Sequence, residues 1–399
     1  MPTVDPFAPA ALGPITLRNR IIKSATFEGV MPDALVTEEL IEYHRKVAAG
    51  GVGMSTVAYL GVSPDGRTHA ECLYMRDEAI PGLRRLTDAI HAEGALASAQ
   101  IGHAGLVANM KSNGLPSLAP SRRFSPLSFS FTPAATRADL DRVIADYART
   151  ARGAEAAGFD AVEVHLGHGY LLSSFLSPGL NGRTDEYGGS LENRARFPRA
   201  VLRAVREAVG GRLAILAKLN MVDAMPGGLE EEESLSVARM IESDGSLDAL
   251  ALTGGSSYGN PMFLFRGEAP RKEFAAHLPF LLRMGFRLIG RRFMPATPFE
   301  EAYFEPLARR FRDALDLPII LLGGINRRET IEKAIADGFA FVQMGRALLR
   351  EPDLLLRMQD GSQKEGICIH CNRCMPTIYT GTRCVLIDPE PIAGGPPVA

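Results

Sequence analysis

The feature that most constrains the fold of this chain is a regular alternation of short β-prone runs with longer amphipathic stretches. Eight runs rich in β-branched or apolar residues have strand length, at residues 20–25, 51–58, 95–101, 160–165, 213–220, 248–253, 318–323 and 340–345. The clearest stretches of helical period between them are residues 37–49, 80–93, 138–157, 191–209 and 300–315. Strands that alternate with helices pair in parallel, so the pattern predicts an α/β fold of the (β/α)8 TIM barrel type.

Two long stretches interrupt this alternation, residues 102–137 and 254–299, and each follows a predicted strand. Loops after strands lie on the catalytic face of a barrel, so both insertions are expected to shape an active site there. The second is apolar and rich in arginine, and a subunit contact in a homo-oligomer is an equally good interpretation. A doubly wound sheet is the rival fold, but the glycine-rich phosphate fingerprint that such a fold carries after its first strand is missing from this sequence. We expect a barrel domain at residues 1–358 and a short cysteine-containing C-terminal tail at 359–399.

Charge and hydropathy narrow the class of function. The formal net charge is -2 and there is no long run of Lys or Arg, which argues against nucleic-acid or anionic-membrane partners. The start of the sequence lacks the pattern of a secretory signal, and no apolar run reaches the roughly 18 residues of a membrane span. These features predict a cytoplasmic enzyme that acts on a small-molecule substrate.

The predicted fourth strand ends in a group of three proton donors. His165, His168 and Tyr170 offer two imidazole N–H groups and one phenol O–H group. Together they can hold a carbonyl oxygen and protonate a carbon, which would stabilise the enolate that forms when hydride adds to a β-carbon. Two alternatives remain: the histidines satisfy buried polar groups only, or they bind zinc, although the helical HExxH spacing is absent.

Glycines after the last two predicted strands indicate a phosphate site. Gly323 and Gly324 follow the seventh strand, and Gly345 and Arg346 follow the eighth. In barrels these two loops often bind phosphate through backbone N–H groups and positive charge. The alternative is that the glycines only allow a tight turn after a buried strand.

Two further strand ends carry polar residues, Gln100 and Lys218. A primary amide has both a donor and an acceptor and matches the edge of a uracil-like ring, and a cation beside such a ring favours its reduced, anionic form. Lys218 could equally pair with a carboxylate inside the barrel, and Gln100 could hold a loop.

Four of the five cysteines lie close together near the C-terminus, as Cys368, Cys371, Cys374 and Cys384. This clustering suits metal binding better than a disulfide framework. Four thiolates could bind an iron–sulfur cluster or zinc, and reduced thiols without a metal are the third interpretation.

The segment that follows the histidines, HGYLLSSFLSPGLNGRTDEYGGSLENRARF, closely resembles the signature of the Old Yellow Enzyme and NADH:flavin oxidoreductase family. LRNRIIKSAT near the start, AQIGHAG around Gln100, GGI and MGRALLREP are also similar, and these matches span roughly residues 5–358. The resemblance implies FMN across the top of the barrel, reduced by NAD(P)H before the substrate enters the same face. No Rossmann motif is then required.

The resemblance also implies roles for individual residues. It places Ser24, Ala25, Thr26 and Ala58 beside the isoalloxazine, Gln100 on its pyrimidine, Lys218 near N1, and Gly323, Gly324, Gly345 and Arg346 at the phosphate. His165 and His168 match the pair that binds the substrate's activating oxygen, and Tyr170 matches the proton donor. A structural network around the strand-four loop is expected from Arg183, Asp185, Glu192, Asn193, Arg194 and Arg196, with Ser190 as a helix N-cap.

The sequence departs from that family pattern in two places. Glu28 stands where some relatives have an aromatic substrate contact. The cysteine motif resembles the [4Fe-4S] motif of the trimethylamine dehydrogenase and 2,4-dienoyl-CoA reductase branch, although its last gap is shorter. We therefore expect an ene-reductase that moves hydride from NAD(P)H through FMN to an activated alkene. A flavin-dependent amine dehydrogenase or demethylase is the alternative, and a non-catalytic FMN-binding barrel is the third hypothesis.

Overall fold

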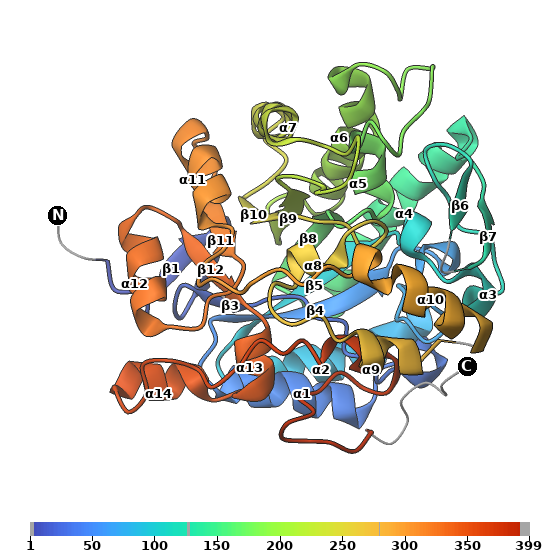
Figure 1. The fold of residues 1–399 in the computed structure, drawn as a ribbon. Helices are drawn as coiled ribbons and strands as arrows, with labels where there is room; N and C mark the ends of the chain where they lie inside the picture. Colours follow the sequence, from blue (N-terminus) through green and yellow to red (C-terminus); the bar gives the residue numbers. More distant parts are fainter. Residues whose placement is uncertain (1–3, 126–127, 279, 392–399) are drawn as a thin grey trace.

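Eight parallel strands of the computed structural model close into a barrel, in the cyclic order β3, β4, β5, β8, β9, β10, β11, β12 (Figure 1). The structure describes residues 4–125, 128–278 and 280–391. The strands are β3 (Ile21–Lys23), β4 (Met54–Gly61), β5 (Leu96–Gly102), β8 (Ala161–Leu166), β9 (Ala214–Asn220), β10 (Ala249–Thr253), β11 (Ile319–Leu322) and β12 (Phe341–Met344). Each overlaps one predicted run, so the predicted (β/α)8 barrel is confirmed.

The barrel interior is apolar at the N-terminal ends of the strands and polar at their C-terminal ends. Ala161, Leu216 and Phe341 belong to one buried apolar cluster inside the barrel. A hairpin of β1 (Ala10–Leu12) and β2 (Ile15–Leu17) packs into the same cluster and closes that end. Barrel enzymes keep their catalytic groups at the opposite end, where the inward-facing positions of this chain become polar.

The helices surround the barrel (Figure 1). They include α1 (Glu38–Ala49), α2 (Ile80–Ala92), α4 (Arg137–Ala156), α5 (Leu171–Leu176), α6 (Leu191–Val209), α7 (Glu231–Ser243), α11 (Glu305–Ala314), α12 (Arg328–Ala336), α13 (Arg346–Arg350) and α14 (Leu354–Asp360). The local sequence determines where several helices begin. The side chains of Thr37 and Ser190 cap the N-termini of α1 and α6, and Thr136 forms a capping box with Asp139 at the start of α4.

The helix predicted from residue 300 begins later, at Glu305. Pro306 lies in its first turn, where a missing N–H group costs nothing. In a helix interior the same proline would remove a hydrogen bond and clash with the preceding turn. The prediction was therefore wrong for residues 300–304, of which 301–304 form turns.

An ion pair fastens α2 to the N-terminal face of the barrel. His91 Nε2 lies 2.7 Å from Asp160 Oδ2, and the same carboxylate oxygen accepts a hydrogen bond of 2.8 Å from the backbone N–H of Ala97. The hydrogen bond to Asp160 raises the pKa of His91 above its usual value. The protonated ring is therefore more favourable in the folded chain than in the unfolded chain.

We expect His91→Gln to lower the free energy of unfolding more at pH 5.5 than at pH 8.5. A raised folded pKa gives stabilisation that is complete below the unfolded pKa of about 6.5 and is lost as the pH rises through the folded pKa. The loss of unfolding free energy at pH 5.5 should exceed that at pH 8.5 by about 0.5 kcal/mol. The difference is small because both side chains are partly exposed to solvent. Urea unfolding of both proteins at the two pH values measures it, and an equal difference at both would contradict the assignment.

Both insertions follow strand ends, as predicted, and contain elements that the sequence pattern did not reveal. The first holds α3 (Met110–Asn113) and a hairpin of β6 (Arg123–Ser125) and β7 (Ser130–Thr132). The second holds α8 (Pro261–Leu264), α9 (Arg271–Ala276) and α10 (Phe280–Phe293). The Tyr258 hydroxyl donates to the carbonyl of Phe124 at 3.0 Å and joins the two insertions.

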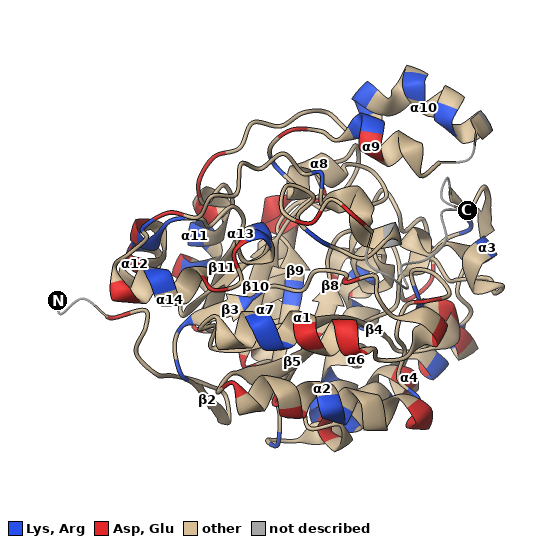
Figure 2. Cartoon of the chain, turned by 90° about the horizontal axis from the view of Figure 1, so that it is seen from below, with Lys and Arg blue, Asp and Glu red and all other residues tan. Residues whose placement is uncertain are grey.

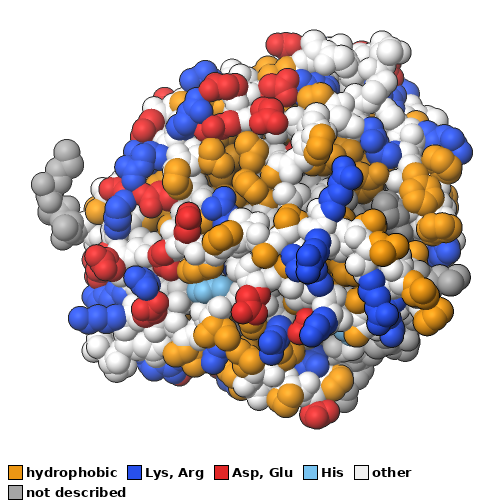
Figure 3. Space-filling view, viewed as in Figure 1, with side chains coloured by type: hydrophobic (Ala, Val, Ile, Leu, Met, Phe, Trp, Pro, Cys, Tyr) orange, Lys and Arg blue, Asp and Glu red, His pale blue; other side chains and the backbone are white. Residues whose placement is uncertain are grey.

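The insertions expose apolar side chains beside arginines. Basic residues lie along α10 in Figure 2, and apolar side chains lie among them on the surface in Figure 3. The helix packs against its own insertion through Phe286. Among the described residues of the two insertions, the exposed large apolar side chains are Leu115, Phe124, Phe129, Phe131, Phe280, Leu282, Met284, Leu288 and Ile289. Such patches mark contact surfaces, and a homo-oligomer stays a prediction.

The C-terminal segment packs against two distant parts of the chain. The backbone N–H of Thr382 donates to the carbonyl of Glu28 at 2.7 Å. The Asn372 amide donates to the carbonyls of Phe265 and Glu268 at 2.7 and 2.9 Å. Residues 392–399 of the predicted tail lie outside the described residues. Over the described ranges, none of the helices has the length and apolar character needed to cross a membrane.

Candidate functional site

His165, His168 and Tyr170 come together at the C-terminal end of β8. His168 has a positive φ of 60° and Gly169 one of 78°, and this left-handed turn brings the two imidazoles together. His168 Nδ1 lies 3.3 Å from His165 Nε2. The ring centroids of His165 and Tyr170 are 4.4 Å apart. The structure thus brings the three predicted catalytic residues into one cluster.

Both imidazoles of this cluster are neutral. Burial, helped by the nearby charge of Lys218, lowers the pKa of His165 to about 3. Burial, followed by the proximity of His165 and Lys218, holds the pKa of His168 well below its usual value. A neutral imidazole has one N–H donor and one acceptor nitrogen, so the pair can hold an electron-rich oxygen or sulfur without introducing a buried charge.

Two polar residues that were not predicted from the sequence fix His168 in place. Its Nε2 lies 2.9 Å from the hydroxyl of Thr253, the last residue of β10. Its backbone N–H donates to Asn220 Oδ1 at 3.0 Å, at the end of β9. Both are polar residues at the end of a buried apolar strand, a signal that could have identified them.

A second buried polar cluster lies inside the barrel just below these histidines. Gln100 Nε2 and Gln343 Nε2 each donate to Glu163 at 2.8 Å, and Lys218 Nζ lies 3.0 Å from the same carboxylate. Lys218 Nζ is also 3.4 Å from Ser24 Oγ. In the strand register, Gln100 is paired with Glu163, and His165 with Lys218, which places their side chains on the inward-facing side of adjacent strands.

Lys218 pairs with a carboxylate inside the barrel, which is one of the two interpretations that its sequence position allowed. Glu163 and Gln343 were not predicted. Glu163 had a visible signal: it is a charged residue in an otherwise apolar strand, two positions before His165 and therefore on the same side.

Ser24, Ala25 and Thr26 directly follow β3, and Ala58 lies within β4, beside a buried ion pair. Lys23 Nζ lies 2.8 Å from Glu28 Oε1, and Glu28 Oε2 accepts from the backbone N–H of Ala58 at 3.3 Å. Thr26 Oγ1 is 3.3 Å from Glu28 Oε1. Glu28, which stands where some relatives have an aromatic substrate contact, is buried in this chain and paired with a cation.

The glycines after β11 and β12 have different surroundings. A side chain on Gly323 or Gly324 would collide with the rings of Phe304 and Tyr303. This close packing is sufficient to explain both glycines without a bound phosphate. Gly345 has open space on its side-chain face, with only Thr26 at 3.9 Å from where a Cβ would lie. A phosphate site at these glycines stays a prediction.

Arg346 faces the cysteine loop. Its Nη1 donates to the carbonyl of Arg266 at 2.9 Å and to the side-chain oxygen of Asn372. Together with the four clustered cysteines it lines one small cavity, lined also by Leu349, Arg350, Ile369, Asn372, Val385 and Leu386. The cysteines predicted as metal ligands thus gather around a single space.

Burial favours the protonated form of two thiols in this cavity, those of Cys368 and Cys374. Burial raises the pKa of Cys374 to about 12, and burial also raises that of Cys368. Within the part of the chain that the structure describes, no three His, Cys, Asp or Glu side chains converge closely enough to hold a single metal ion. Thiolate ligands must lose their protons when a metal binds, so metal binding here would require both deprotonation and movement of the side chains.

Comparison with known proteins agrees with this geometry. Residues 5–252 match the model of the NADH:flavin oxidoreductase / NADH oxidase family. The chain belongs to this family. Within it, a 4,4'-dithiodibutanoate disulfide reductase of Rhodococcus erythropolis is 59% identical over 97% of this chain and 96% of its own length.

Two more distant relatives of the family are longer proteins. A multifunctional alkene reductase/demethylase of Caballeronia cordobensis is 28% identical over 94% of this chain, which spans only 51% of that protein. A solved 2-naphthoyl-CoA reductase complex superimposes with a TM-score of 0.78 at 25% identity, over 92% of this chain and 54% of that one.

Membership of the NADH:flavin oxidoreductase family implies FMN as cofactor and a nicotinamide as reductant. The residues at the top of the barrel fit such a polar, planar group. Three buried atoms on the barrel strands, Thr56 Oγ1, Ser98 Oγ and His165 Nδ1, have no hydrogen-bond partner among the described residues, and water or a bound molecule would supply one. The glycine at 345 leaves room for a ligand, and the polar cluster below supplies donors and acceptors.

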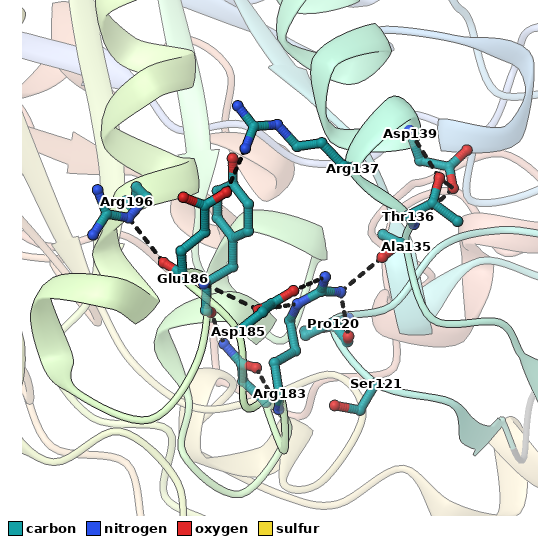
Figure 4. A network of polar contacts seen from close by, with 12 residues as sticks. Pro120, Ser121, Ala135, Thr136, Arg137, Asp139, Arg183, Asp185, Glu186 and Arg196 are labelled. Carbon is teal, nitrogen blue, oxygen red and sulfur yellow. Dashed lines mark hydrogen bonds and ion pairs between the residues drawn. The ribbon is translucent and has the colours of Figure 1, made fainter.

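The predicted structural network around the β8–α6 loop is present (Figure 4). Arg183 pairs with Asp185 and donates to the carbonyls of Ala135 and Pro120 at 2.7 and 3.0 Å. Arg196 Nε donates to the carbonyl of Glu186 at 2.8 Å. Arg194 bonds to the Leu176 carbonyl and to Glu233, and Ser190 caps α6 through the N–H of Asn193. These bonds connect the segment to the first insertion, through Pro120 and Ala135, and to α7, through Glu233.

Proposed function

We propose that this chain is an NAD(P)H-dependent reductase that uses FMN to reduce a small-molecule acceptor held by His165, His168 and Tyr170. The observation that carries the proposal is the cluster of two neutral, buried imidazoles and a phenol at the mouth of the barrel. When bound, FMN supplies the two-electron relay between the nicotinamide and the acceptor. Gln100, Lys218, Ser24, Ala25, Thr26, Ala58, Gly323, Gly324, Gly345 and Arg346 are the proposed FMN contacts.

Small organic disulfides are the acceptor class that we favour. The disulfide reductase that is 59% identical over nearly the whole chain supports this choice. In such a reaction NAD(P)H provides a hydride equivalent, the S–S bond breaks, one sulfur leaves as a thiol and the other as a thiolate that takes up a proton. The N–H groups of His165 and His168 can stabilise the departing thiolate, because preorganised donors in a site that excludes water stabilise developing negative charge.

Activated alkenes are the second acceptor class, and the same residues favour it. The two imidazoles can bind the carbonyl oxygen of an enone, hydride adds to the β-carbon, and Tyr170 donates its proton to the α-carbon. The relative named as an alkene reductase/demethylase supports this activity and keeps amine demethylation as an alternative.

We also propose that the cavity of Cys368, Cys371, Cys374 and Cys384 binds an iron–sulfur cluster. All four cysteines line one space, and ligation by four cysteine thiolates is the usual arrangement for such clusters. Zinc would need the four sulfurs to converge more tightly around one ion. Iron and acid-labile sulfide analysis of anaerobically purified protein tests the proposal, and zinc or no metal would contradict it.

The acceptor class is tested in single-turnover experiments without oxygen. We expect NADH or NADPH to bleach the bound flavin, and a small aliphatic disulfide to restore its colour with release of two thiols per flavin. 2-Cyclohexenone should restore it more slowly. Bleaching by a methylated amine in the absence of nicotinamide would support the demethylase alternative instead. Colourless protein that does not take up FMN would contradict the proposal as a whole.

A further inference from the structure

Glu163 lies at the centre of the polar layer inside the barrel. Its Oε1 accepts from Gln100 at 2.8 Å and lies 3.0 Å from Lys218 Nζ, and its Oε2 accepts from Gln343 at 2.8 Å. The side chain is buried, so its negative charge is balanced inside the protein by Lys218 and by two amide N–H groups.

The carboxylate also fixes which way the two amides face. An ionised carboxylate can only accept hydrogen bonds, so Gln100 and Gln343 must turn their NH2 groups toward it. Their carbonyl oxygens then point elsewhere, and that of Gln343 is 3.4 Å from Ser24 Oγ. Gln100 is therefore set to offer its carbonyl oxygen to a bound ring, where a ring N–H group can donate to it.

We propose that Glu163 is a positioning residue that sets the reduction potential of bound FMN, by compensating the charge of Lys218 and by orienting Gln100. The inference rests on the FMN site proposed above. A buried cation favours the reduced cofactor, which carries additional negative charge, and a carboxylate 3.0 Å from that cation cancels much of the effect. Glu163 thereby lowers the reduction potential and makes the reduced enzyme a stronger reductant.

Three variants of the FMN-loaded protein test the charge argument. Glu163→Gln should shift the two-electron equilibrium toward the reduced flavin by at least tenfold, which corresponds to about 30 mV more positive. Lys218→Met should shift the midpoint potential in the opposite direction, because Glu163 is then uncompensated. The double variant should return toward the wild-type value. Midpoint potentials are measured by anaerobic titration against reference dyes, without any acceptor.

This pattern of signs separates an electrostatic role from a merely structural one. Glu163→Asp keeps the charge and should stay closer to the wild-type potential than Glu163→Gln. If Glu163→Gln does not fold, Lys218→Met alone decides, since an unchanged or raised potential would overturn the proposal. FMN-loaded variants with equal potentials would also overturn it and leave the proposed function intact. A wild-type protein unable to bind FMN would refute the proposed function itself.

Discussion

Replacing Tyr170 by Phe is expected to slow the oxidation of the reduced enzyme by 2-cyclohexenone by about 100-fold or more, while its reduction by NAD(P)H changes less than about twofold. The phenol is the group placed to protonate the α-carbon, with its ring 4.4 Å from that of His165. Hydride transfer from the nicotinamide needs no such acid. Stopped-flow measurement of the two half-reactions separates them, and equal slowing of both would contradict the role of Tyr170.

The same variant distinguishes the two acceptor classes. A thiolate is a good leaving group with a thiol pKa of about 8.5, so its departure needs little help from an acid. The α-carbon of an enone, by contrast, must receive its proton from an acid at neutral pH. We therefore expect Tyr170→Phe to slow oxidation by an organic disulfide by less than about tenfold, against about 100-fold for the enone.

Tyr59 provides the matched control. Its ring packs edge-to-face against Tyr170 with centroids 5.6 Å apart, and its hydroxyl donates to the carbonyl of Gly66. Tyr59→Phe removes one buried hydroxyl beside the site, at a cost of about 1 kcal/mol in the free energy of unfolding. Both half-reactions should keep rates within about twofold of wild type. Similar kinetic losses in the two variants would mean that hydroxyl removal acts through packing.

Gly29→Ala is expected to lower the free energy of unfolding by about 3 kcal/mol or more, and to release the C-terminal segment from the barrel. Gly29 has φ of +66°, and a Cβ there would overlap the carbonyl oxygen of Ile378. The segment around Ile378 also bonds to the chain beside Gly29, where Thr382 donates to the carbonyls of Phe27 and Glu28. Urea unfolding measures the loss of stability.

Release of the segment has its own readout. Arg383 is 7% exposed and donates to the carbonyls of Gly381 and Thr380 at 2.8 and 3.1 Å, so trypsin should cut there slowly in the wild type. Cleavage after Arg383 should become fast in Gly29→Ala, as mass spectrometry of the fragments would show.

Gly114→Ala controls for backbone strain. Gly114 has nearly the same φ, +67°, but no atom lies within 4 Å of where its Cβ would be. The left-handed conformation alone costs an L-residue about 1–2 kcal/mol. We expect Gly114→Ala to lower the free energy of unfolding by that amount and to leave Arg383 protected from trypsin. Equal losses in the two variants would mean that the segment at Ile378 moves aside without cost.

Local sequence was sufficient to predict the fold of this protein. Strand and helix periods depend on residues only a few positions apart, so all eight barrel strands could be located before any contact was known. His165, His168 and Tyr170 could also be found locally, because one short segment contains them and the end of a barrel strand is where catalytic groups lie. Pro306 was the local signal that was overlooked, and it moved the start of α11.

The partners of the buried polar residues could not be read in this way. Glu163 bonds to Gln100, Lys218 and Gln343, which come from three other strands, and only closure of the barrel brings them together. The same holds for Glu28, which accepts from the backbone N–H of Ala58, and for Arg346, which faces the cysteine loop. The sequence by itself determined the barrel and the identity of its reactive groups, because these follow from local periodicity. The tertiary structure alone decided which charges compensate one another, because hydrogen bonds and ion pairs depend on distances between residues far apart in the chain.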